Sequence, residues 1–163
     1  FDQVEAAVLN VARYDVFKLG EAVLAGQVAR ALKMLDGLQA EGEAAVLVHW
    51  TLAEDIRALK RVKDAMADGK PLPMALREAR VWGSKERLYE RVLPSLADHQ
   101  LAHLVEAASV CDGIIKGLKH PEWPQDAWAA LKRLMLLTMQ PLLSSPAPPR
   151  GAAPARTQLA LQA

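Results

Sequence analysis

The sequence lacks most features that identify a catalytic site, a membrane protein or a disulfide-bonded fold. Its single cysteine, Cys111, excludes an internal disulfide and any multi-cysteine zinc site, and is compatible with a reducing cytoplasm. The apolar runs are far too short to cross a bilayer. No glycine-rich phosphate loop and no recognisable Ser-His-Asp arrangement occur. We therefore expect no catalytic residue, cofactor, metal, small-molecule substrate or membrane contact.

A strong excess of either charge is also absent. The 163 residues include 20 basic and 19 acidic side chains, which give a formal net charge of +1. A domain that binds DNA mainly through its phosphates is usually far more basic. The balance argues against a stand-alone nucleic-acid binder. Because the chain begins at Phe1 rather than Met, we expect it to be a piece of a longer protein.

Strand signals are nearly absent, whereas helix-forming residues dominate the composition. Apolar side chains recur every three or four positions, and glycine and proline interrupt the pattern. We predict an all-α bundle of about seven to eight helices. The expected helices lie near 3–11, 16–25, 28–41, 44–68, 74–81, 84–93, 98–117 and 124–139.

Two apolar faces can be predicted within these helices. In the helix that begins at Asp98, the spacing predicts that Cys111 and Leu118 point inward, with Cys111 a buried small hydrophobe. In the last helix, the run Leu134-Met-Leu-Leu-Thr-Met139 is apolar on more than one face. A surface helix needs only one such face, so the second implies central burial or a partner.

The composition changes abruptly after the last helix. The stretch that follows Pro141 is rich in serine, proline and alanine and cannot form a core. We predict that residues 140–163 form a flexible tail.

Two histidines one helical turn apart, His99 and His103, have the spacing of a zincin zinc site. Gln100 stands where that motif needs its general-base glutamate, and no third ligand follows. Both histidines flank apolar positions, so the favoured interpretation is a pair of solvated residues at the edge of the buried face.

A basic stripe, which consists of Arg57, Lys60, Arg61 and Lys63, lies in the longest predicted helix. It could contact phosphates or an acidic partner. Glu54 and Asp64 flank it, and the favoured interpretation is a solvated helix face.

Tryptophan stands at a predicted helix break, where Trp82 follows Arg80 and precedes Gly83. Tryptophan and arginine are enriched in interaction hot spots, so Trp82 could be an exposed anchor. The favoured alternative is that Trp82 packs in the core, as we expect also for Trp123 and Trp128.

An ordered set of motifs resembles one family. Arg80-Val81-Trp82, then Asp112 to Lys116-Gly117, and then Trp128 occur in the order found in the C-terminal helical region of the bacterial DNA polymerase III delta subunit. The segments 11–26 and 27–42, and the stretch from Ala44 to Leu59, are similar to the same region.

The resemblance implies a non-catalytic collar domain of the clamp loader. Residues 1–25 would then be the end of the middle domain and 26–139 the collar itself. The implied partners are the gamma/tau and delta-prime subunits, with DNA present in the complex and the sliding clamp held by a separate N-terminal domain. The candidate partner interface comprises Arg80, Trp82, Lys116, Leu136, Leu137 and Met139.

Overall fold

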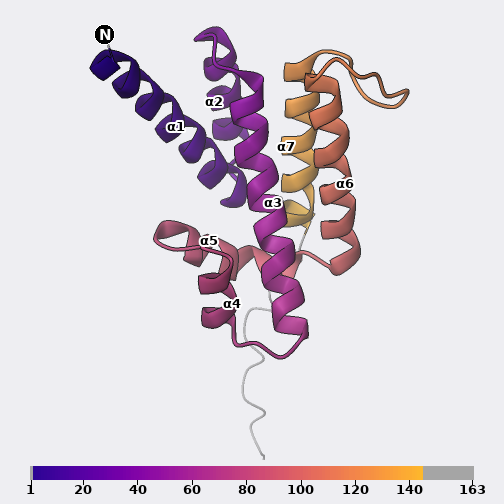
Figure 1. The fold of residues 1–163 in the computed structure, drawn as a ribbon. Coiled ribbons are helices and arrows are strands. Elements are labelled where there is room, and N and C mark those ends of the chain that lie inside the picture. Colours follow the sequence, from indigo (N-terminus) through magenta and orange to yellow (C-terminus); the bar gives the residue numbers. More distant parts are fainter. Residues whose placement is uncertain (1, 145–163) are drawn as a thin grey trace, which may run out of the picture.

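A computed structural model describes residues 2–144, which contain helices and no strand (Figure 1). The elements are α1 (Asp2–Leu24), α2 (Val28–Ala40), α3 (Ala45–Ala67), α4 (Leu72–Glu78), α5 (Ser84–Val92), the 3-10 helix η1 (Leu93–Ser95), α6 (Asp98–Ile115) and α7 (Ala127–Ser144). The all-α prediction of seven to eight helices is confirmed for this part of the chain. None of these helices is long and apolar enough to span a membrane.

Helix α3 organises the bundle. It packs against α6 and α7 on one flank, α1 on the other, and α4 at its C-terminal end (Figure 1). Its side chains at three- and four-residue steps, such as Leu52, Ile56 and Leu59, are at most 3% exposed. This spacing aligns them on one face, so their burial is what fixes α3 at the centre.

The N-terminal region is one helix, so the prediction of separate helices at 3–11 and 16–25 is wrong. Asp15 lies inside α1 instead of capping a second helix. Aspartate is a weak helix former but no helix breaker, and no glycine or proline interrupts the chain there. Val16 and Leu19 are fully buried, so packing from Val16 onward holds this half of α1 in the core.

The turn after α6 corrects a second prediction. Leu118 was expected to point inward but is 68% exposed. Helix α6 ends at Ile115, and Gly117, with φ of 92°, turns the chain in the left-handed conformation that glycine adopts without strain. The Leu118 N–H then bonds to the Gly113 carbonyl oxygen at 2.8 Å, which turns its side chain away from the core.

Helix α7 starts and ends later than expected. The predicted start at Pro124 lies in the preceding turn, and Asp126 Oδ2 accepts the Ala129 N–H at 2.9 Å. Residues 140–144, assigned to the tail, are helical despite Pro141. Leu142 packs against the core, and its burial offsets the loss of the backbone hydrogen bond that a proline cannot donate. The rest of the predicted tail, 145–163, lies outside the described residues.

Candidate functional site

A groove of about 1010 Å³ lies between the C-terminal part of α1, helix α3 and the α4–α5 segment. Three large aromatic side chains on its walls face solvent: Trp82 is 66% exposed, Trp50 is 60% exposed and Phe17 is 39% exposed. We call it the aromatic groove. Core packing of Trp82 was therefore the wrong alternative, whereas Trp123 and Trp128 do pack against the core.

The chain projects Trp82 outward by two unusual backbone conformations. Arg80 has φ of 59°, the left-handed region that usually requires glycine or asparagine, and Gly83 has φ of 70°. Between them Val81 is 6% exposed and anchors the segment, with its N–H bonded to the Leu76 carbonyl oxygen at 2.9 Å. Non-glycine residues in this region carry strain, which is found preferentially at functional sites.

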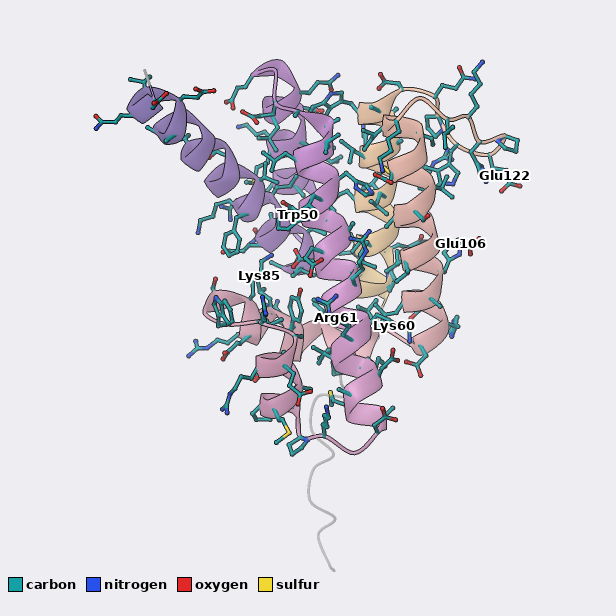
Figure 2. All side chains as sticks on the ribbon, in the orientation of Figure 1. Trp50, Lys60, Arg61, Lys85, Glu106 and Glu122 are labelled. Carbon is teal, nitrogen blue, oxygen red and sulfur yellow. The ribbon has the colours of Figure 1, made fainter. Side chains whose placement is uncertain are left out.

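A buried ionic network forms part of the wall of the aromatic groove. Asp55, 8% exposed, accepts hydrogen bonds from Lys85 Nζ at 2.8 and 2.9 Å and from Tyr89 Oη at 2.8 Å. Lys85 also lies 4.6 Å from the centroid of the Phe17 ring. Figure 2 shows Trp50 and Lys85 on the same side of the molecule. The contacts fix α5 against α1 and α3, since a buried carboxylate needs a paired cation.

The network has a direct effect on Tyr89. Burial of its phenol and the neighbouring Asp55 charge raise the pKa of Tyr89 far above its ordinary value. Tyr89 therefore stays a neutral donor to Asp55. Close packing also constrains the residue type at position 20, because a Cβ atom on Gly20 would lie 3.0 Å from Asp55 Oδ2.

A second groove, of about 570 Å³, follows α7 and is closed by the start of α2 and the turn before α7. We call it the leucine groove. Leu136 is 37% exposed, Leu143 is 58% exposed and Leu137 is half-buried, so the apolar run does present a second face. Met139 also lines the groove, but it is 1% exposed and packs in the core, so it offers almost no contact surface.

Lys116 stands apart from both grooves. Its exposed ammonium pairs with Asp112 at 2.7 Å, and this hydrogen bond lowers the pKa of the Asp112 carboxyl. On the buried side of Asp112, His49 is 5% exposed, and its Nε2 lies 2.7 Å from the Ala108 carbonyl oxygen. Because a carbonyl only accepts, Nε2 carries the proton and ties α3 to α6.

The structure does not preserve the basic stripe as one surface. Lys60 pairs with Asp64 at 2.5 Å, and Arg61 pairs with Glu54 at 2.8 Å. Lys63 turns away and donates to the Leu93 and Leu96 carbonyl oxygens. Figure 2 shows Lys60 and Arg61 on different sides of α3. Among the described residues, these intramolecular contacts leave Arg57 as the exposed cation of the stripe for which no such pairing is found.

Among the described residues, no group of three or more acidic, histidine or cysteine side chains is placed to hold a metal ion. His99 and His103 are exposed, as the edge interpretation expects. Cys111 is fully buried, and burial raises the pKa of its thiol to about 12. The prediction of a buried small hydrophobe is confirmed.

Sequence reasoning missed Trp50, His49 and the partners of Asp55. Trp50 lies on the exposed side of α3. The three- to four-residue spacing of the apolar side chains predicts this exposure, but it does not predict a groove. His49 and Asp55 gain their roles from residues far along the chain, such as Ala108 and Lys85.

Known proteins resemble this chain over most of its length. A family model described as the C-terminal region of the DNA polymerase III processivity clamp loader gamma complex matches residues 16–144. DNA polymerase III subunit delta of Escherichia coli strain K12 is 30% identical over 135 residues, which cover 83% of this chain and 38% of that protein.

A solved structure, the Bacillus subtilis DNA clamp loader delta protein, has the same fold with a TM-score of 0.60 and 15% sequence identity. It covers 79% of this chain, which corresponds to 37% of that structure. The chain thus spans well under half the length of both relatives.

Proposed function

Since this chain belongs to the family of C-terminal domains of the DNA polymerase III clamp-loader delta subunit, we propose that it is a non-catalytic assembly domain. It joins other subunits of the clamp loader during DNA replication. The neighbouring subunits are gamma/tau and delta-prime, which it contacts as part of a ring of helical collar domains. Contact with the sliding clamp belongs to another part of the full-length subunit.

The observation that carries this proposal is the exposure of large apolar side chains on a domain with a complete core. Trp50, Trp82, Leu136 and Leu143 all remain at the surface. A monomer seldom leaves such side chains clustered in grooves, and aromatic residues are enriched at interface centres. With a net charge of +1, the chain suits a protein interface better than the phosphate backbone of DNA.

The domain division follows the same proposal. Residues 26–139 form the collar and 1–25 lead into it, with the second half of α1 packed on the collar's core. Arg80, Trp82, Lys116, Leu136 and Leu137 stand as the proposed contact residues, and Trp50 joins them on the wall of the aromatic groove.

The alternative, a DNA-binding or regulatory module that uses the basic stripe, is not favoured. Two of its four cations are paired with carboxylates, and a third is bonded to backbone carbonyls. Phosphates would have to displace these contacts.

Assembly can be tested directly by mixing the purified chain with full-length gamma/tau and delta-prime, and by running light scattering behind a sizing column. We expect a complex whose mass equals the sum of its subunits. The chain alone should hydrolyse no ATP. A persistent monomer at micromolar concentrations, together with salt-dependent binding to primer-template DNA, would contradict the proposal and support the alternative.

A further inference from the structure

We infer that the leucine groove receives a helix of another clamp-loader subunit, one that carries apolar side chains flanked by acidic ones. The inference rests on the proposed function, and it names the surface on this chain and the chemistry of the partner.

The spacing along α7 indicates a helix as the occupant. Leu136 and Leu143 are seven residues apart, and both are exposed. Side chains at this separation lie on the same side of a helix, two turns apart. Exposed leucines at heptad spacing form the seam along which a second helix packs. The half-buried Leu137 widens the apolar strip toward the core.

The walls of the groove leave room for that helix. Val28 at the start of α2, Pro124 in the turn before α7 and Ala129 in α7 line it together with the leucines. At the far end Leu143 faces Gly26, where a Cβ atom would lie 3.8 Å from the Leu143 side chain. The φ of 73° at Gly26 favours glycine at this position beside Leu143.

The charges in the groove select the partner. Lys132 and Arg133 are the charged side chains that line it, and none of its lining residues is acidic. Arg133 lies 5.3 Å from the Trp123 ring centroid and donates to the Glu122 carbonyl oxygen, so it is held in place without a carboxylate partner. A second copy of this chain that presented the same groove would bring only further cations, whereas acidic side chains would neutralise both.

Surface variants of the whole chain provide the test. In Leu136→Asp/Leu143→Asp two carboxylates replace the exposed leucines, and Leu118→Asp is the matched control because Leu118 is 68% exposed and lies outside the groove. We expect the double variant to bind full-length gamma/tau or delta-prime at least about tenfold more weakly, and the control to bind as the wild type does. Far-UV circular dichroism checks that each variant is folded.

A crosslinking measurement identifies the occupant. Because the only cysteine, Cys111, is fully buried, Leu136→Cys introduces one accessible thiol for a photo-crosslinker, and Leu118→Cys is its control. We expect the Leu136→Cys adduct to map by mass spectrometry to a partner helix with Asp or Glu beside apolar residues.

The outcomes separate the two proposals. A wild-type complex that the groove variant does not weaken would overturn the inference and leave the assembly function standing. Crosslinking mainly to a second copy of this chain would also overturn it. If the wild type forms no complex with either subunit, both proposals fail.

Discussion

Tyr89 illustrates how one residue couples the core to the aromatic groove. Its side chain is 1% exposed, and its hydroxyl donates to the same Asp55 carboxylate that Lys85 neutralises. Each member of the network would be costly to bury alone, since an unpaired buried polar group loses its hydration without compensation. The three residues therefore act together to hold α5 in the wall of the groove.

Tyr89→Phe tests this network. At pH 7 it should lower the free energy of unfolding by about 1 kcal/mol, because Asp55 loses a donor. The raised pKa of Tyr89 means that its stabilising contribution is complete below the unfolded value of 10.0 and falls as the pH rises above it. Urea unfolding from pH 7 to 11 should therefore show a steeper alkaline loss for the wild type than for the variant. Parallel pH profiles would contradict the coupling.

Cys111 allows an independent check of burial. With a thiol pKa of about 12 and no exposed surface, it forms almost no thiolate at pH 8. The native protein should not react with Ellman's reagent, whereas the urea-unfolded chain should release one equivalent of chromophore. Leu118→Cys, with its exposed thiol, should react rapidly in the native state. Rapid labelling of native wild-type Cys111 would mean that α6 is not packed as described.

At the scale of the elements, the helix ends decide which surfaces are presented. Helix α4 ends at Glu78 and α5 begins at Ser84. The five residues between them include the left-handed Arg80 and Gly83, which place Trp82 outside. Helix α7 continues through Pro141, which extends its exposed strip to Leu143 and thereby lengthens the leucine groove.

Two glycine substitutions should have opposite effects on stability. Gly37 lies inside α2 with open space around it, so Gly37→Ala should stabilise the protein by about 0.5–1 kcal/mol. Gly83 has φ of 70° and ψ of −143°, a region essentially restricted to glycine, so Gly83→Ala should cost about 1–3 kcal/mol. Thermal unfolding followed by circular dichroism measures both. Equal effects would show that the backbone around Trp82 is not constrained.

At the scale of the whole molecule, one core crosses the proposed boundary at residue 25. The buried side chains of α1 (Val16, Leu19, Ala22, Val23 and Leu24) share a cluster with those of α2, α3 and α7. The two grooves lie on different parts of this single core, one formed with α4–α5 and the other with α7. An assembly domain with two such surfaces can contact a neighbour on each side.

Truncation should reveal how far the core reaches. A chain that begins at Asp15 keeps all five buried side chains of α1, whereas one that begins at Gln27 loses them. Each large buried side chain contributes about 1.5–3 kcal/mol against a typical total of about 5–15 kcal/mol. We expect a cooperative urea transition only from the longer fragment. Equal transitions from both fragments would assign α1 to a separate unit.

The sequence by itself determined the helical class, most helix positions and the burial of Cys111. These follow from the three- to four-residue spacing of apolar residues and from the glycines and prolines that end the helices, which are local signals. The same local pattern showed the extra apolar face of α7, and the ordered motifs around Arg80 and Asp112 indicated the family.

Only the tertiary structure decided which of these residues face solvent and which meet. Trp82 is exposed and Met139 is buried. Asp55 forms hydrogen bonds with Lys85 and Tyr89, which lie thirty or more positions away in the sequence. The physical reason is that exposure and ionic pairing depend on how helices pack, and packing joins residues that no local period connects. Both grooves arise in this way, since each is lined by helices far apart in the chain.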